Sequence, residues 1–348
     1  MIKKKQLKKV RILLIGPLPD PKGGVSIHIK RLGELISPYY EVNYVDESSV
    51  RKIEYFNLRS KKLFSYLKLI YWADIVHIHS GMLFLRIFHL CLSKLLFKKV
   101  IITIHYTFKN HNLFLHKVYL NLCNRVIFVN KETAQLLSLC TATYIKEAFI
   151  PQNIANEPVL PQNIQCWIKE RKAQGYAIIG ANAWRLDLYN NTDLYGLDMC
   201  IKLINEIKIQ AVKKVAFIFT VSSVPKSDTI FRNYITQIKK LDLENDFLLT
   251  EQNVSFVRII EYSDVVLRPT ITDGDALTIR EALYMGVPVI ASDIVNRPKP
   301  TILFKCRNQE DLFAKVNSTL ENIIEETRKI RYNITNDYLS FYKNLYNF

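Results

Sequence analysis

The most constraining feature of this sequence is an alternation of short apolar runs with longer helical patterns. The first run, Val10–Gly16, is apolar on both faces, and Asp74–His79 and Val100–His105 have the same character. Strands that are apolar on both faces are typical of parallel sheets covered by helices on each side. The sequence therefore predicts an α/β fold built on parallel sheets.

The alternation runs through the first half of the chain, stops, and starts again. The first half predicts strands at Val10–Gly16, Glu41–Val45, Asp74–His79, Val100–His105 and Arg125–Val129, and helices at Val25–Ile36, Ile53–Trp72, Met82–Phe97 and from Lys131 onward. A segment rich in proline and asparagine, Phe149–Gln165, then predicts a linker. The second half predicts strands at Tyr176–Gly180, Val215–Val221, Phe247–Thr250, Val265–Leu267 and Val287–Ala291, and helices at Leu194–Ile209, Thr229–Leu241, Ala276–Met285 and within Asn308–Phe348. With 348 residues the chain is long enough for two such units, and we expect a cleft between the carboxyl edges of their sheets.

Positive charge is concentrated in the first half. Residues 1–150 hold 24 Lys and Arg against 9 Asp and Glu, a balance of +15, whereas the whole chain carries +16. The dense clusters are Lys3, Lys4, Lys5, Lys8, Lys9 and Arg11, and Arg51, Lys52, Arg59, Lys61, Lys62 and Lys68. The second cluster alternates with Phe64 and Leu67, a pattern that favours a basic amphipathic helix on an anionic membrane surface. An ordinary solvated helix face and a nucleic-acid surface are the alternatives, and no recognition motif supports the latter.

Two groups of residues in the first half suggest a ligand site. Gly23 and Gly24 precede a predicted helix, so a ligand anion can approach the free N–H groups at its start, although a tight turn explains the pair equally well. His79 and His105 end two predicted strands and are expected to line the cleft, with His77 packed in the interior. Metal binding by these histidines is possible, but no neighbouring Asp or Cys completes a site.

The most specific pattern lies in the second half. Asp273 falls in the loop after a predicted strand, and Glu281 follows within the next helix, with seven residues between them. Backbone amides around Gly274–Leu277 begin that helix and can bind a diphosphate, while the two carboxylates can hold hydroxyls of a sugar and a ribose. The simpler alternative is a helix-capping Asp and a surface Glu.

The stretch Val266–Asp293 resembles the signature of family-4-type glycosyltransferases of the GT-B fold, in which an acidic residue and a Glu are separated by seven residues. The Gly23–Gly24 loop with His28, and the strands at Asp74–His79 and Ile102–His105, are similar to other parts of that family. The resemblance implies two Rossmann-like domains, 1–155 and 166–329, with a helix at about 330–348 that packs back on the first. Their sheets would face a central cleft.

The resemblance also implies roles for individual residues. Glu281 would bind the nucleotide ribose, and Asp273 the donor sugar, with Gly274, Asp275, Ala276 and Leu277 nearby. Gly23, Gly24 and Arg185 would contact the donor diphosphate, and His105 would lie beside the reacting sugar. Two departures stand out: the first acidic residue is Asp rather than Glu, and Tyr195 stands where the family has a phosphate-binding Lys. Lys22 and Arg297 are candidates for the missing cation.

The implied activity is retaining transfer of a sugar from a UDP- or GDP-linked donor, with no metal and no cofactor, as in synthesis of bacterial capsule or lipopolysaccharide. The partners would be the sugar nucleotide, a lipid-linked or glycan acceptor and an anionic membrane, and not nucleic acid. We expect a cytoplasmic enzyme, peripheral on the inner face of the membrane, because no apolar run without charges is long enough to span it. A sugar-nucleotide epimerase and a non-catalytic membrane-peripheral scaffold of the same fold are the alternatives.

Overall fold

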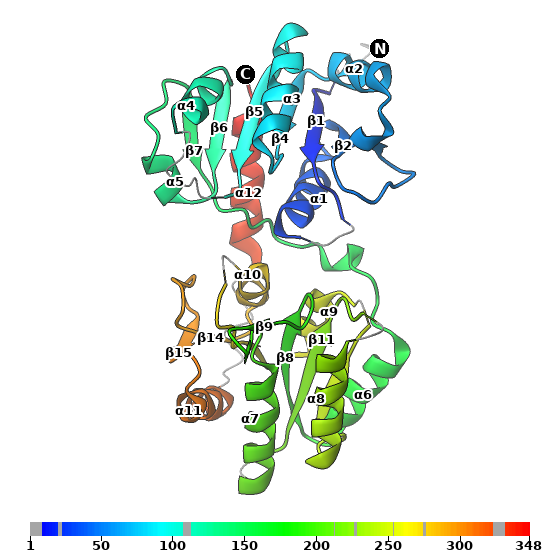
Figure 1. Cartoon of the computed structure of the whole chain (residues 1–348), viewed down its shortest axis with the longest axis vertical. Coiled ribbons are helices and arrows are strands. Elements are labelled where there is room, and N and C mark those ends of the chain that lie inside the picture. The colour runs from blue at the N-terminus through cyan, green and yellow to red at the C-terminus, as the bar shows by residue number, and fades with distance from the viewer. Residues whose placement is uncertain are drawn as a thin grey trace, which may run out of the picture. The chain divides into compact units, whose positions relative to one another are not determined.

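The chain forms two units, the first from Met1–Ile150 with Thr335–Phe348, and the second from Pro151–Ile334. The computed structural model (Figure 1) describes residues 9–19, 23–106, 113–211, 213–225, 228–252, 254–273, 276–322 and 331–348. The change from unit 1 to unit 2 lies at the start of the predicted linker. Most of that linker therefore belongs to unit 2.

Unit 1 is built on a seven-stranded parallel sheet with the strand order β3-β2-β1-β4-β5-β6-β7. The strands are β1 (Arg11–Gly16), β2 (Glu41–Asp46), β3 (Phe56–Asn57), β4 (Ile75–Ile78), β5 (Lys99–Ile104), β6 (Arg125–Phe128) and β7 (Ala142–Ile145). The residues Ile12–Ile15 of β1 are fully buried, as expected for a central strand with helices on both faces.

Alternate residues of these strands supply two apolar faces. Leu13, Val76 and Ile102 pack in one core with the helices of the first face, which are α2 (Leu63–Trp72), α3 (Leu83–Leu95) and α4 (Leu113–Asn121). The opposite face carries His77 and is covered by α1 (Gly24–Ile36) and α12 (Arg331–Tyr346). The short helices η1 (Leu58–Ser60) and α5 (Lys131–Gln135) complete the described part of this unit.

Helix α12 follows unit 2 in the sequence but packs on the sheet of unit 1 (Figure 1). The Tyr346 hydroxyl lies 2.7 Å from Nδ1 of His77, which is fully buried in β4. Arg125 of β6 donates hydrogen bonds to the carbonyl oxygens of Asn344, Leu345 and Asn347, at the carboxyl end of the helix. A cation at this end is favourable because the last carbonyl groups of a helix have no partner within it.

Unit 2 is built on a six-stranded parallel sheet with the order β12-β11-β8-β13-β14-β15. The strands are β8 (Ala177–Ala183), β11 (Val215–Val221), β12 (Phe247–Thr250), β13 (Val265–Arg268), β14 (Val289–Ser292) and β15 (Ile302–Phe304). A small antiparallel hairpin, β9 (Leu188–Tyr189) and β10 (Thr192–Asp193), follows β8. Together with unit 1, this confirms the predicted α/β fold with two parallel sheets.

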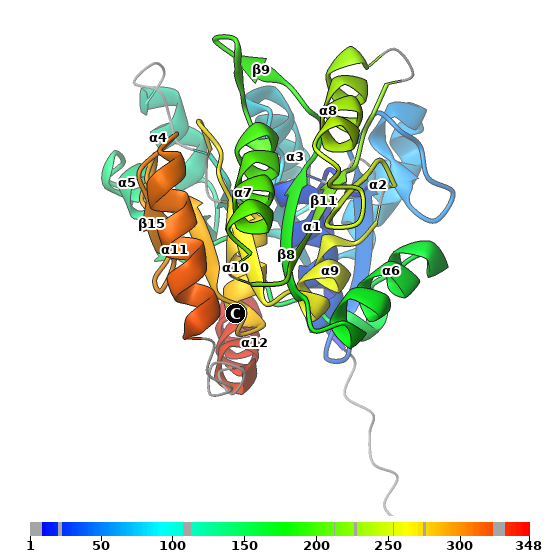
Figure 2. The same cartoon turned by 90° about the horizontal axis from the view of Figure 1, so that it is seen from below.

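Helices cover both faces of the second sheet. One core contains Phe217 and Phe219 of β11 and the helices α7 (Leu197–Gln210), α8 (Thr229–Lys240) and α11 (Gln309–Glu321), of which α7 and α11 lie side by side (Figure 2). The other core contains Ile218 and the helices α6 (Gln162–Ala173), α9 (Phe256–Tyr262) and α10 (Leu277–Tyr284). The short helix η2 (Ile154–Asn156) precedes α6.

The single helix predicted over Ile53–Trp72 is wrong, because only Leu63–Trp72 is α-helical. Before it, Phe56 and Asn57 pair with β2, and the Asn57 side chain accepts a hydrogen bond from the backbone of Arg59. Lys61 then has a φ of 57°, a left-handed conformation that ends a right-handed helix. The sequence analysis also missed α4, β7, α6, α9, β15 and the β9–β10 hairpin.

Within the described ranges, no helix combines the length and the hydrophobicity that crossing a bilayer requires.

Candidate functional site

A group of charged side chains gathers at the carboxyl edge of the unit 2 sheet. Arg268 is the last residue of β13, Asp273 lies in the loop after it, and Arg297 follows β14. The carboxyl edge of a parallel sheet is where open α/β folds bind ligands. Gly274 and Asp275, which were predicted to bind the donor, lie outside the described residues.

Asp273 is held by both arginines. Its Oδ2 accepts from Arg268 Nε at 3.0 Å and from Arg297 NH1 at 2.8 Å, and its Oδ1 accepts from Arg268 NH2 at 3.1 Å. Burial by itself raises the pKa of Asp273, but the hydrogen bonds and charges of Arg268 and Arg297 outweigh burial and lower the pKa below its ordinary value. Asp273 is therefore an ionised carboxylate with both oxygens occupied by guanidinium groups.

Glu281 lies on α10, the helix that follows this loop, and is 5% exposed. The start of α10 is tied to the central strand, because Thr278 Oγ1 donates to the side-chain oxygen of Asn182 in β8 at 3.1 Å. Ala276 precedes the helix in an extended conformation and Leu277 begins it, so their amides are at the amino end as predicted from the sequence. Glu281 is the fifth residue of α10, and a buried carboxylate there is suited to accept hydrogen bonds from hydroxyl groups of a ligand.

Arg185 also follows a strand at this edge, two residues after the end of β8. Its side chain is 46% exposed and pairs with Asp187 at 3.1 Å. The structure therefore places Arg185 at the carboxyl edge, but in a local surface ion pair rather than in the group around Asp273.

A cavity of about 930 Å³ opens at the same edge of the sheet. Its lining residues follow β11 and β12 or belong to α8, and include Val224, Pro225, Glu251 and Gln252. Arg268, Asp273 and Glu281 are not among its described lining residues, so this cavity is separate from the group around Asp273.

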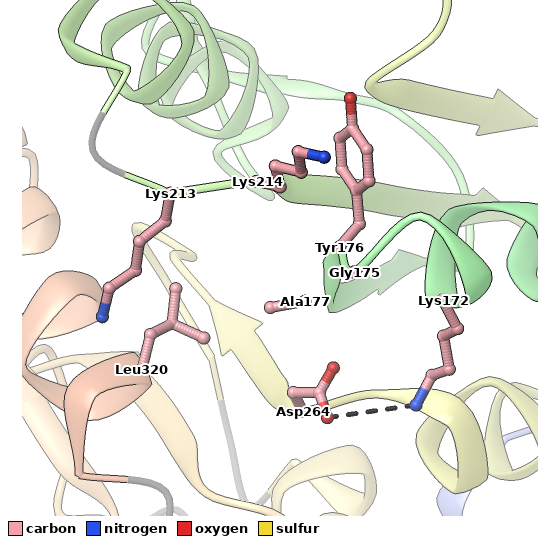
Figure 3. Close-up of a pocket in the computed structure, with 8 residues that line it drawn as sticks. All are labelled: Lys172, Gly175, Tyr176, Ala177, Lys213, Lys214, Asp264 and Leu320. Carbon is pink, nitrogen blue, oxygen red and sulfur yellow. Dashed lines mark ion pairs between the residues drawn. The ribbon is translucent and has the colours of Figure 1, made fainter.

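A second cavity of unit 2, of about 500 Å³, lies at the opposite edge. Figure 3 shows Lys172, Lys214, Tyr176 and Asp264 around it, with Lys172 paired to Asp264 at 3.9 Å. Tyr176, Lys214 and Asp264 each come directly before a strand, so this cavity lies at the amino ends of β8, β11 and β13. It is not part of the candidate site.

In unit 1, Gly24 is the first residue of α1 and Gly23 precedes it. A Cβ atom added at Gly24 would meet no atom of the described residues within 4 Å, so these residues leave space beside this backbone. The Ser26 hydroxyl accepts from the Gly23 amide and donates to the Gly23 carbonyl, both at 2.9 Å, which fixes the entry into the helix. The space and the helix start are consistent with the predicted approach of an anion.

Three histidines meet at the carboxyl edge of the unit 1 sheet. Nδ1 of His79 lies 3.0 Å from Nε2 of His105, and the ring of His28, from α1, lies 4.9 Å from that of His105 and 5.3 Å from that of His79. The His77 ring packs against that of His79 with 4.1 Å between ring centres, and its Nε2 lies 2.8 Å from the Thr103 hydroxyl, which agrees with its predicted interior position. His79 is itself fully buried.

Burial keeps these imidazoles neutral. Burial lowers the pKa of His28 to about 4 and, together with the neighbouring imidazoles, the pKa values of His77, His79 and His105 well below the ordinary value. A neutral imidazole has one N–H donor and one acceptor nitrogen. His28 Nδ1 lies 2.6 Å from the Ala148 carbonyl oxygen, so Nδ1 carries the proton and Nε2 is the acceptor.

This geometry predicts that acid destabilises the protein. An unfolded histidine binds a proton near pH 6.5 but folded His28 does so only near pH 4, so in this window the unfolded state holds more protons and stability falls as pH falls. Each such histidine contributes a slope of about 1.4 kcal/mol per pH unit. Urea unfolding between pH 7.5 and 4.5 measures how the free energy of unfolding depends on pH. His28→Gln should reduce this slope by about 1.4 kcal/mol per pH unit, which corresponds to one proton. An unchanged slope would contradict the assignment.

The ring nitrogens of His28, His79 and His105 lie within 4.8 Å of one another and could ligate a metal ion. The hydrogen bond between His79 and His105 uses Nδ1 of His79, and among the described residues its Nε2 has no hydrogen-bond partner. The sequence analysis grouped His79 with His105 but did not foresee that His28, on a separate helix, completes the cluster.

The comparisons with known proteins bear on the fold. No family model matches the sequence, and neither does any curated protein. Among solved structures, a glycosyltransferase from Rickettsia africae is 17% identical, covers 97% of each chain and has a TM-score of 0.66. HepE from Anabaena, with UDP and glucose, is 16% identical over 95% of each chain (TM-score 0.61), and sucrose-phosphate synthase from Thermosynechococcus elongatus is 16% identical over 97% of this chain and 99% of its own (TM-score 0.60). The chain therefore has the GT-B fold of these enzymes.

Proposed function

We propose that this protein is a retaining glycosyltransferase that moves a sugar from a UDP- or GDP-linked donor to a lipid-linked or polysaccharide acceptor, without a metal ion. The observation that carries the proposal is the placement of Glu281 and Asp273 at the carboxyl edge of unit 2, in a fold shared with glycosyltransferases. The bacterial HepE structures with UDP and with UDP-glucose support the donor class.

In the proposed reaction the bond between the anomeric carbon and the diphosphate oxygen breaks, and its electron pair stays on that oxygen. The acceptor hydroxyl oxygen forms the new bond to the anomeric carbon and releases its proton. Negative charge therefore grows on the leaving diphosphate, and cations and backbone amides that face it lower the barrier. In unit 2 we assign this role to arginines at the carboxyl edge and to the start of α10.

Glu281 binds the ribose in this proposal, and His105 binds the donor sugar. Neutral His105 is suited to this because His79 contacts its Nε2 and fixes its ring, leaving the rest of the ring for a hydroxyl group. Gly24, with open space beside its backbone, contacts the diphosphate.

A lipid-linked acceptor fits the surface of unit 1. A groove of about 290 Å³ between α2 and α3 is lined by Phe56, Leu58, Lys61, Lys62, Leu63, Tyr66, Phe84, Leu85 and Phe88. Phe64 and Phe84 beside it are 81% and 72% exposed, an unusual exposure for phenylalanine. Apolar side chains next to lysines are suited to an anionic membrane, in which the rings enter the lipid and the ammonium groups bind phosphates. We propose that the enzyme works there, on the inner face of a bacterial membrane, in synthesis of capsule or lipopolysaccharide.

Membrane contact predicts a loss of vesicle binding when both lysines are neutralised. Each lysine near an anionic surface contributes about 1 kcal/mol, so Lys61→Gln with Lys62→Gln should weaken binding to phosphatidylglycerol vesicles about 30-fold. Sedimentation with the vesicles measures this. The control is the adjacent pair on α8 of unit 2, Lys239→Gln with Lys240→Gln, which should bind like the wild type. Equal losses for the two pairs would show a general charge effect and contradict a specific contact through α2.

The function is tested by release of UDP or GDP from a panel of sugar nucleotides, with and without a bacterial lipid extract. A glycosyltransferase releases nucleoside diphosphate in amounts that depend on the extract. An epimerase would convert the free sugar nucleotide without an acceptor, and a non-catalytic scaffold would do neither. Either of the last two results would overturn the proposal.

A further inference from the structure

Arg268, Arg297 and Asp273 form an ion-pair group at the carboxyl edge of unit 2, and in this group positive charge exceeds negative charge. Arg268 and Arg297 both contact Asp273, and among the described residues Asp273 is the one carboxylate that forms an ion pair with either guanidinium. A guanidinium group does not lose its proton in proteins. The three side chains therefore carry two positive charges against one negative charge, and the excess favours an anion.

The two arginines differ in exposure. The Arg297 side chain is 2% exposed and donates through NH1 to Asp273 and, at 3.4 Å, through NH2 to the Thr270 hydroxyl. The Arg268 side chain is 14% exposed, and its NH1 donates to the carbonyl oxygen of Asn182 at 3.3 Å. Each terminal nitrogen of a guanidinium has two hydrogens, so Arg268 keeps N–H groups for a ligand after these contacts. Arg268 is thus the arginine that reaches the surface, and Arg297 is the buried arginine that contacts Asp273.

Arg268 also lies beside the amino end of α7. Its guanidinium carbon is 5.4 Å from the centre of the Tyr195 ring, and Tyr195 precedes Gly196, the residue directly before that helix. The backbone of Gly196 packs on Pro269, the residue after Arg268. The amides of Tyr195 and Gly196 already donate to Asp193 Oδ1 at 2.8 Å, so the positive charge at this helix start comes from Arg268. Tyr195 is the position at which a second phosphate-binding cation was expected, and the structure brings Arg268 there rather than Arg297. Lys22, the other candidate, lies outside the described residues.

We infer that Arg268 binds the diphosphate of the sugar nucleotide, and that Asp273 and Arg297 are positioning residues that hold Arg268 in place. This inference rests on the proposed function. It changes the predicted role of Asp273, which acts through Arg268 instead of binding the donor sugar. In the reaction Arg268 stabilises the charge left on the diphosphate oxygen when the bond to the anomeric carbon breaks.

The roles can be separated by calorimetric titration of the full chain with uridine, UDP and UDP-glucose, or with guanosine, GDP and GDP-mannose if the donor is GDP-linked. Arg268→Gln should weaken binding of UDP about 10- to 100-fold, the usual effect of losing a hydrogen-bonded charge, and leave uridine unaffected. Arg268→Lys should restore part of the affinity because it keeps the charge. The matched control is Arg258→Gln, which removes an arginine of α9 that pairs with Glu261.

Asp273→Asn tests the positioning role. If Asp273 acts only by positioning Arg268, the variant loses a contact to the diphosphate, and its affinities for UDP and UDP-glucose should fall by the same factor. If Asp273 binds the sugar directly, the affinity for UDP-glucose should fall and that for UDP should stay unchanged, which would overturn this part of the inference. UDP binding by Arg268→Gln at wild-type affinity would overturn the role of Arg268 while the proposed function stands. If the wild type binds none of the nucleotides, the proposed function fails and the inference with it.

Discussion

Replacing Glu281 by alanine is expected to lower kcat/KM for sugar transfer by about 100-fold or more, because each hydrogen bond from a ligand to a charged group contributes about 1.5–3 kcal/mol. Glu281 is a buried carboxylate on α10, and in the proposed site it accepts hydrogen bonds from the ribose hydroxyls. Release of nucleoside diphosphate from the donor identified by the panel measures the effect. Because the ribose is bound in the ground state and in the transition state alike, most of the loss should appear in KM.

The matched control is Glu261→Ala on α9, which removes a carboxylate that pairs with Arg258 on the surface of the same unit. Its kcat/KM should stay at the wild-type value. Wild-type turnover by the Glu281 variant would refute the donor site assigned to this edge of unit 2. A loss confined to kcat would place Glu281 at the reacting atoms instead of at the ribose.

Replacing Gly196 by alanine is expected to destabilise the protein by about 2–4 kcal/mol. Gly196 has a φ of 69°, which an L-amino acid with a Cβ adopts at a cost. The added Cβ would also lie 2.4 Å from the carbonyl oxygen of Pro269, a backbone atom that cannot move aside like a flexible side chain. The midpoint of urea unfolding, followed by tryptophan fluorescence, measures the loss.

Gly175→Ala is the control for the backbone conformation. Gly175 has a φ of 80°, but a Cβ there meets nothing within 4 Å. The free energy of unfolding of this variant should therefore fall by about 1–2 kcal/mol, which is the cost of the left-handed conformation without the clash. Equal losses at the two glycines would show that the contact between Gly196 and Pro269 is not a tight one. Because Pro269 adjoins Arg268, the Gly196 variant should also bind UDP more weakly.

The strands could be predicted from the sequence because their hydrophobic pattern is continuous. Val215–Val221 and Phe247–Thr250 match β11 and β12 to the residue. Prediction failed where tertiary contacts decide the local conformation. Residues 53–62 have helical composition, but the edge of the sheet takes Phe56 and Asn57 into β3 and a left-handed Lys61 follows. The short edge strands β7 and β15 depend in the same way on a neighbouring strand.

For the candidate site, the sequence indicated the segment that carries Asp273 and Glu281, but not the arginines that contact Asp273. The spacing of Asp273 and Glu281 pointed to the loop after β13 and to α10, which are the elements at the carboxyl edge. The sequence analysis missed Arg268, because the motif was read from its two acidic residues and the arginine at the end of the preceding strand is not part of that motif. Arg297 is 24 residues from Asp273, and its contact with the carboxylate depends on strands β13 and β14 being neighbours. A charged residue at the end of a strand with an apolar pattern was the available signal.

The return of α12 to unit 1 has a consequence for biosynthesis. A ribosome releases all of unit 2 before it releases the helix whose Tyr346 contacts His77 and whose last turn binds Arg125. Until then, the part of the first sheet that α12 covers is exposed and available to chaperones. Unit 2 is continuous in the sequence and unit 1 is not, so the half of the protein that is translated first should be the half that matures last.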